Sequence, residues 1–260
     1  MNEPFKLLGA RLRVASLERS AAFYSGVLGL HATPGVRSGE QNFSPDFEGQ
    51  PLLTLVETPG AVPAAGDAAG LFHLALLVPN RAALARVLLR LSERRAVLQG
   101  LSDHRVSEAI YLADPDGNGL EIYADRPKSG GAGSGAVDMT TQTLDIPDLL
   151  SAAPDRRPSG LPPGTRLGHV HLRVTNLNEA ERFYTEKLPL VVSTRNYPGA
   201  LFFAADGYHH HVAANTWGVR RSQPKEAHAG LEAVLAAVPG LKASAVISDA
   251  DGNRFELAAA

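Results

Sequence analysis

An internal repeat is the feature that most constrains the fold of this chain. When the sequence is shifted by 160 residues, segments of its two halves match. The matches are Leu-Arg-Val at 12–14 and 172–174, Phe-Tyr at 23–24 and 183–184, and Gly-Leu at 70–71 and 230–231. Recurrence at a fixed spacing indicates copies of one folding unit, so both halves should have the same architecture.

The repeat is interrupted near the C-terminus. The sequence Asp-Pro-Asp-Gly-Asn at 114–118 matches Asp-Ala-Asp-Gly-Asn at 249–253, but at an offset of 135 rather than 160, so the second half lacks 25 residues before this turn. The first half has a helix-like run there, residues 82–91, whose apolar residues recur at three- and four-residue intervals. We therefore expect the last repeat unit to lack its helix.

Each half contains two strand-and-helix units, so the chain should consist of four modules. A segment rich in Gly, Ser and Pro separates the halves and is predicted to be a linker, within which residues 144–152 should form a short helix. The predicted divisions are a first domain at 1–126 with modules at about 5–62 and 68–126, a linker at 127–165, and a second domain at 166–260 with modules at about 166–217 and 226–260.

Composition limits the possible functions. The chain has 260 residues, 44% of them hydrophobic, and a formal net charge of -2, which is typical of a globular protein and predicts no nucleic-acid partner. It has no cysteine, so any metal must be held by His, Asp or Glu. No run approaches the roughly 20 apolar residues that span a membrane, and the first residues do not resemble a signal peptide. We therefore expect a cytoplasmic protein without a membrane partner.

Histidines are the most informative polar residues. Three of the nine stand together at His209, His210 and His211. If this segment is a strand, alternation places His209 and His211 on one face and turns His210 away. By the same rule His169 and His171 share a face in their own predicted strand.

Several longer motifs resemble the vicinal oxygen chelate superfamily, which includes glyoxalase I, bleomycin-resistance proteins and extradiol dioxygenases. They are Gly-His-Val-His-Leu-Arg-Val at 168–174, Tyr-His-His-His at 208–211, and Asp-His-Arg-Val-Ser-Glu-Ala-Ile-Tyr at 103–111. The resemblance covers nearly the whole chain and is strongest to two-domain catechol 2,3-dioxygenase-like proteins. It implies an α+β fold of four βαβββ modules paired into two half-open barrels, the last module shortened, with a divalent metal on an inner wall.

The resemblance also implies where ligands lie, because the family takes them from the first and last strand of each module. In the second half His169, His211 and Glu256 occupy three of these four positions, and the fourth is Ala233. The corresponding residues of the first half are Gly9, Leu53, His73 and Glu121. We therefore predict one metal site, formed by His169, His211 and Glu256, and expect His73 and Glu121 to be packing or turn residues. His171 and His209 are the predicted catalytic residues, His209 being also the alternative ligand.

Two histidines and one carboxylate suit non-haem Fe²⁺, with Mn²⁺, Zn²⁺ or Ni²⁺ as alternatives. The leading hypothesis is extradiol ring cleavage of a small catecholic aromatic. Known extradiol enzymes use a tyrosine three residues before the turn aspartate, which is Val246 in the second half. Tyr111 and His104 preserve such a tyrosine and a nearby histidine in the first half, where they either line a separate pocket or only pack.

Two other functions stay open from the sequence. A glyoxalase-type metal isomerase or lyase is favoured by the last-strand position of His211. A non-catalytic small-molecule-binding protein of the bleomycin-resistance kind is favoured by the shortened last module. All three have a small-molecule partner, and a homodimer is compatible with each.

Overall fold

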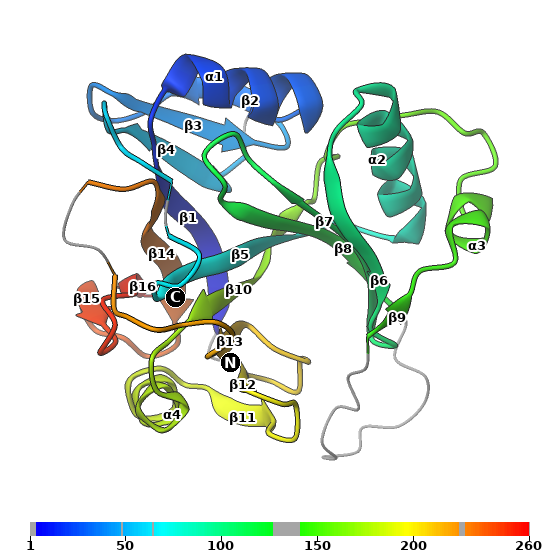
Figure 1. Ribbon diagram of the computed structural model, residues 1–260. Helices are drawn as coiled ribbons and strands as arrows, with labels where there is room; N and C mark the ends of the chain where they lie inside the picture. The colour runs from blue at the N-terminus through cyan, green and yellow to red at the C-terminus, as the bar shows by residue number, and fades with distance from the viewer. Residues whose placement is uncertain (1–3, 48, 64, 127–140, 224–226, 260) are drawn as a thin grey trace.

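A computed structural model describes residues 4–47, 49–63, 65–126, 141–223 and 227–259 (Figure 1). Its strands and helices follow the repeat. Module 1 contains β1 (Lys6–Val14), α1 (Leu17–Ala21) continued by the π-helix η1 (Ala22–Val27), β2 (His31–Pro34), β3 (Glu40–Ser44) and β4 (Leu53–Glu57). Module 2 contains β5 (Gly70–Leu77), α2 (Arg81–Glu93), β6 (Leu98–Asp103), β7 (Ser107–Ala113) and β8 (Gly119–Asp125). Both modules have the order βαβββ.

The second half repeats this order once and then shortens it. Module 3 contains β10 (Arg166–Arg173), α4 (Leu177–Lys187), β11 (Val191–Thr194), β12 (Ala200–Ala204) and β13 (Val212–Asn215). Module 4 contains β14 (Gly230–Val238), β15 (Ala245–Ser248) and β16 (Arg254–Ala259). In module 4 only residues 239–244 separate the first two strands, and the described residues 227–259 contain no helix.

The segment between the halves is partly ordered onto module 2. Strand β9 (Gln142–Thr143) pairs with β6, and helix α3 (Ile146–Ser151) packs beside α2 (Figure 1). The expected short helix is confirmed, and residues 127–140 of the predicted linker lie outside the described residues. No helix in the described part of the chain is long and apolar enough to cross a membrane.

The sheets join modules from different halves. In the seven-stranded sheet, with order β15-β16-β14-β1-β4-β3-β2, module 1 pairs with module 4 through antiparallel β1 and β14. In the nine-stranded sheet, with order β11-β12-β13-β10-β5-β8-β7-β6-β9, module 2 pairs with module 3 through antiparallel β5 and β10. The α+β fold of paired modules is confirmed. The division into domains at 1–126 and 166–260 stays a prediction, and each sheet takes strands from both of these segments.

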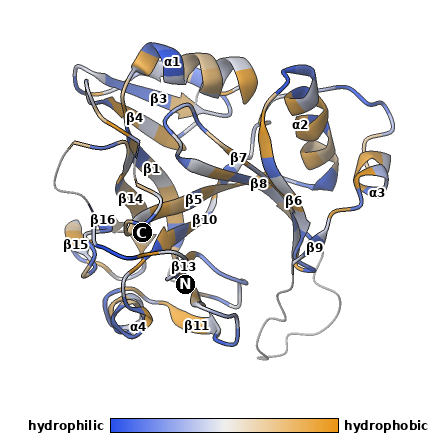
Figure 2. Cartoon of the chain, viewed as in Figure 1, coloured by the Kyte–Doolittle hydropathy of each residue, from blue (hydrophilic) through white to orange (hydrophobic). Residues whose placement is uncertain are grey.

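Strand alternation separates the core from the concave face of the nine-stranded sheet. On β10, Val170 and Leu172 belong to the main hydrophobic core, and on β5 Leu74 and Leu76 do the same. The intervening residues point to the opposite face because successive side chains of a strand alternate. Hydrophobic residues gather on the central strands, including β5 and β14 (Figure 2). The histidines of β5 and β10 therefore project away from the core.

The repeated Phe-Tyr motif fixes the turns before the last strands. The Tyr24 hydroxyl donates to Asp114 over 3.0 Å, and the Tyr184 hydroxyl donates to Asp249 over 2.7 Å. Each aspartate also accepts backbone N–H groups of its own turn, as Asp114 does from Asn118 over 2.8 Å. The helical segment of one module thus holds the turn of the next module along the chain.

Candidate active site

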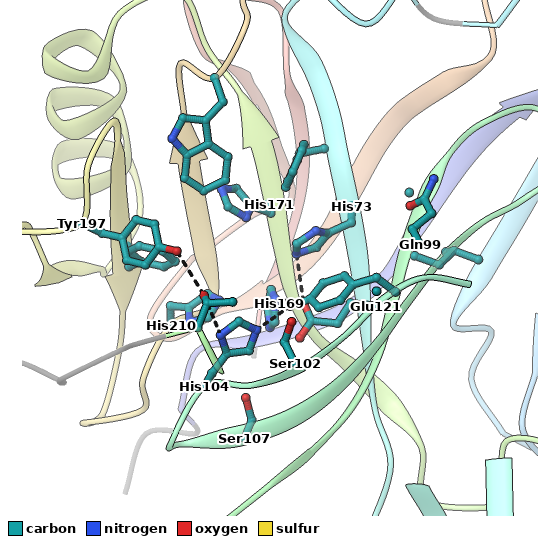
Figure 3. A pocket seen from close by; sticks show the side chains of 18 of the residues that line it. His73, Gln99, Ser102, His104, Ser107, Glu121, His169, His171, Tyr197 and His210 are labelled. Atoms are coloured by element: carbon teal, nitrogen blue, oxygen red, sulfur yellow. Dashed lines mark hydrogen bonds and ion pairs between the residues drawn. The ribbon is translucent and has the colours of Figure 1, made fainter. Parts of the chain in front are cut away.

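A cavity of about 450 Å³ lies between modules 2 and 3 (Figure 3). One wall is formed by β5 to β8 and the other by β10, β12 and the segments beside them. Its polar lining includes His73, His104, Tyr111, Glu121, His169, His171, Arg173, Tyr197 and His210. Five of these residues are histidines, so the cavity is rich in nitrogen donors for a metal.

Three buried side chains form a cluster at this cavity. His73 comes from β5, Glu121 from β8 and His169 from β10, and one ligand atom of each lies within 4.8 Å of the other two. The Nε2 atom of His73 lies 3.0 Å from Oε2 of Glu121, and the Nε2 atom of His169 lies 3.1 Å from the same oxygen. The three pairing strands β10, β5 and β8 are neighbours in one sheet, which brings these side chains together.

The geometry of this cluster fits a divalent metal ion. Two ligands at right angles, each about 2.1 Å from a metal, lie about 3.0 Å apart, which matches the two observed separations. The Nε2 atom of His73 does not form a hydrogen bond of ordinary geometry with Glu121. It has no other hydrogen-bond partner in the described chain. Two imidazoles and one carboxylate form the donor set of non-haem Fe²⁺ sites, which leave other coordination positions open.

Burial sets the protonation of the cluster. Loss of solvent lowers the pKa of His169 to about 4. Burial alone would raise the pKa of Glu121, but the interactions with His169 and His73 outweigh it and the pKa lies well below its ordinary value. At neutral pH His169 is therefore neutral and Glu121 ionised, which are the forms that bind a metal.

The structure does not bring the predicted ligands His169, His211 and Glu256 together. His169 belongs to the cluster, but Glu256 lies on β16 in the other sheet, where it accepts from Arg254 over 2.8 Å. His211 accepts at Nδ1 from the backbone of Ala205, and its ring packs edge-on against Phe5. Glu256 is separated from His169 because module 3 pairs with module 2 and not with module 4. The cluster residues at the family ligand positions of modules 2 and 3 therefore face one cavity.

The histidine triplet also differs from the prediction. Its residues precede β13 in an irregular segment, where Asp206 and Gly207 have φ values of 53° and 69°. Strand alternation does not apply to such a turn. His210, expected to turn away, lines the cavity with its ring centroid 4.1 Å from that of His169. His209 lies behind it, with its Nδ1 atom 2.8 Å from Nδ1 of His210 and its Nε2 atom 3.0 Å from Asp125.

His171 lies where the strand alternation placed it. It lines the cavity two residues beyond His169, and its Nε2 atom accepts from the Asn215 side chain over 2.9 Å. Burial holds the pKa of His171 well below its ordinary value, so the ring is neutral. It can serve as a polar group of the wall without adding a charge.

Tyr111 and His104 lie in the same cavity as the three-residue cluster. The Tyr111 hydroxyl and His104 Nε2 are hydrogen-bonded at 2.7 Å. Burial, and then the neighbouring Glu121 carboxylate, raise the pKa of Tyr111 well above its ordinary value, so the phenol keeps its proton. These residues therefore line a pocket that they share with His169 of the second half.

Comparison with known proteins identifies the family. The profile of the Glyoxalase/Bleomycin resistance protein/Dioxygenase superfamily matches residues 6–122. The chain is 42% identical over 237 residues to a catechol-2,3-dioxygenase of Bacillus subtilis (strain 168), and the match covers 88% of this chain and 81% of that protein. The chain belongs to this superfamily.

Solved structures share the superfamily fold. A putative dioxygenase from Bacillus subtilis superposes with a TM-score of 0.68 at 14% identity, covering all of this chain and 86% of that one. Glyoxalase I from Zea mays superposes with a TM-score of 0.59 at 13% identity, covering 98% and 92%. At these identities the likeness extends to the fold, which confirms the expected vicinal oxygen chelate architecture.

Modules 2 and 3 together supply two histidines and a glutamate at the superfamily's expected ligand positions. His73 and His169 occupy first-strand positions and Glu121 occupies a last-strand position. Tyr111 stands three residues before the turn aspartate Asp114, where extradiol members of the superfamily have their tyrosine. His73, Glu121 and Tyr111, which the sequence analysis did not assign to the metal site, therefore lie at the same cavity as His169. Their positions in module 2 were the sequence signal that could have identified them.

Proposed function

We propose that this protein is a metal-dependent extradiol dioxygenase that cleaves the ring of a small catechol. One observation supports this most directly: His73, Glu121 and His169 converge on the cavity that Tyr111 lines. The 42% identity to a protein named catechol-2,3-dioxygenase supports the same reaction class. The structural argument for a glyoxalase-type isomerase is weakened, because His211 lies outside the ligand cluster.

The proposed cofactor is Fe²⁺, with Mn²⁺, Zn²⁺ and Ni²⁺ as alternatives, and its ligands would be His73, Glu121 and His169. When bound, Fe²⁺ would supply a redox-active centre with open positions for catechol oxygens and dioxygen. The chain contributes a cavity that is partly closed by aromatic side chains. Phe72, Phe202 and Trp217 line it and limit the access of water to the reacting groups.

His210 lines the cavity as a neutral ring, because burial and then the neighbouring His169 lower its pKa well below the ordinary value, and it can accept a hydrogen bond from a catechol hydroxyl. The Asp125 carboxylate only accepts hydrogen bonds, so Nε2 of His209 donates to it. In the His209 tautomer with its ring proton on Nε2, Nδ1 accepts, and His210 donates from its own Nδ1. This leaves the Nε2 lone pair of His210 on the ring edge away from His209. His209 therefore acts as a positioning residue.

Tyr111 is the group placed to donate a hydrogen bond to a substrate oxygen. Its raised pKa keeps the hydroxyl protonated, and it lies beside the ligand Glu121. His104 fixes the hydroxyl from one side and is itself 3.4 Å from Thr141 through Nδ1. His171 is proposed as a hydrogen-bonding partner of the substrate from the opposite wall.

Anaerobic loading with Fe²⁺, followed by catechol and oxygen, tests the proposal. We expect a yellow ring-opened product with one dioxygen consumed per catechol. His73→Ala should abolish both iron retention and turnover, whereas His211→Ala is a matched histidine substitution outside the cluster and should keep both. If wild type consumes no oxygen with any catechol, or if His73→Ala retains iron as wild type does, the proposal is wrong.

A further inference from the structure

We propose that the substrate is a catechol that carries a carboxylate on a short side chain, and that Arg173 binds this carboxylate. The inference rests on the proposed function and names the substrate class of the same site. It is carried by the surroundings of Arg173 and by a comparison with its counterpart in the other sheet.

Arg173 is a half-buried cation in the cavity wall, and no acidic side chain of the described residues pairs with it. Its Nη1 atom donates to the Leu71 carbonyl over 3.2 Å, and its guanidinium lies 5.0 Å from the centroid of the Phe72 ring. Among the described residues it forms no ion pair. Burial lowers its pKa, and no neighbouring carboxylate opposes this shift. A guanidinium has five N–H donors, so most of them stay available to a ligand.

The repeat provides an internal comparison, because Arg13 stands at the equivalent position of the other sheet. Arg13 donates from Nε to the His228 carbonyl over 3.1 Å and contacts the His228 ring over 3.2 Å. At the offset of 160, the counterpart of His228 is Ala68, which has no polar side chain. The arginine is thus present in both copies, but its side-chain partner is missing in the copy that lines the cavity.

A packed aromatic wall of the cavity, formed by Phe72, His171 and Trp217, lies beside Arg173. His169, His171 and Arg173 lie on one face of β10, and the Cα atoms of the first and last are about 13 Å apart along an extended strand. The Phe72 ring centroid lies 4.9 Å from that of His171 and 5.5 Å from that of Trp217, and both are edge-to-face contacts of rings packed against each other. A catechol ring lying against the cavity side of this wall would direct a ring substituent along β10 toward the guanidinium.

The size of the cavity supports a substituted ring. About 150 Å³ suffices for benzene in a protein interior, and this cavity measures about 450 Å³. Arg binds carboxylates through two parallel N–H···O bonds, and a Lys at the same position would not reproduce that geometry. A single carboxylate on a one- or two-carbon chain matches both the space and the charge.

Trp217 allows the proposal to be tested by binding. It is the only tryptophan of the chain and lines the cavity, so its fluorescence reports occupancy without turnover. Anaerobic Fe²⁺-loaded protein is titrated with 3,4-dihydroxyphenylacetate and with its neutral amide. We expect the carboxylate to bind about 10- to 100-fold more tightly than the amide in wild type. Arg173→Gln should bring this ratio close to one, and Arg173→Lys should restore part of it.

Arg13→Gln is the matched control, because it removes the equivalent arginine of the other sheet and should leave the ratio unchanged. The ratio within one variant does not depend on the fraction of folded protein. Equal binding of acid and amide by wild type, or an unchanged ratio in Arg173→Gln, would overturn the proposal. Ring cleavage without a carboxylate preference contradicts only the role of Arg173, whereas an Arg173-dependent preference without ring cleavage contradicts only the proposed reaction.

Discussion

Acid should destabilise the metal-free protein through His169. Burial lowers the pKa of this residue to about 4 in the folded chain, whereas an unfolded chain has a histidine pKa of about 6.5. Between these values the unfolded state binds a proton that the folded state does not. The free energy of unfolding should therefore fall as the pH is lowered from 6.5 toward 4.

The size of the effect follows from the two pKa values. Between pH 7.5 and pH 5, His169 alone should remove ~2 kcal/mol from the free energy of unfolding. His169→Gln removes this titration, so its stability should depend less on pH by about that amount. His211 has its pKa lowered to about 4, mainly by burial, but lies outside the ligand cluster. His211→Gln should flatten the pH dependence similarly without affecting metal retention.

The assay is urea unfolding of chelator-treated protein at both pH values, followed by Trp217 fluorescence. Wild type and both variants should have similar denaturant slopes, so that differences in midpoint report stability. If wild type and His169→Gln lose the same free energy between pH 7.5 and pH 5, burial of the histidine does not have the proposed effect. A steeper dependence in the variant would contradict the sign of the argument.

Two further predictions concern packing around the site. A Cβ at Gly168 would lie 1.9 Å from the hydroxyl of the buried Tyr123, so Gly168→Ala should cost about 1–3 kcal/mol, whereas Gly26→Ala, with nothing within 4 Å, should leave the melting temperature nearly unchanged. Tyr24→Phe and Tyr184→Phe should each cost about 1–3 kcal/mol by removing a buried hydrogen bond to a turn aspartate. Only Tyr24→Phe should also weaken metal retention in equilibrium dialysis, because its turn leads into the strand of the ligand glutamate; equal weakening in both variants would refute this.

The module order could be predicted from the sequence, but the module pairing could not. Matching motifs show which segments fold alike, and these gave the strands and helices of modules 1 to 3. Pairing depends on contacts between distant strands, such as Leu12 with Leu231 and Leu172 with Leu71. Because both pairs join the same repeated motifs, nothing in the motif itself selects the partner module.

The sequence indicates each family ligand position separately, but it does not indicate which positions share one cavity. His73 and Glu121 stand at family ligand positions, and the repeat assigns them to the first half of the chain. Once the sheets pair module 2 with module 3, the same positions give the cluster with His169. The role of His210 could not be deduced from alternation, because the left-handed backbone at Asp206 and Gly207 interrupts the extended chain.

The ligand cluster joins the two halves of the chain. His73 and Glu121 come from the first half and His169 from the second, across the paired strands β5 and β10. A bound ion would therefore be a non-covalent cross-link between halves that descend from one repeated unit. At a free-ion concentration 100 times its dissociation constant, it would add about 2.7 kcal/mol to the stability of the joined state. Metal binding and the pairing of the two cavity walls would thus be thermodynamically linked, because the complete ligand set exists only when both halves are paired.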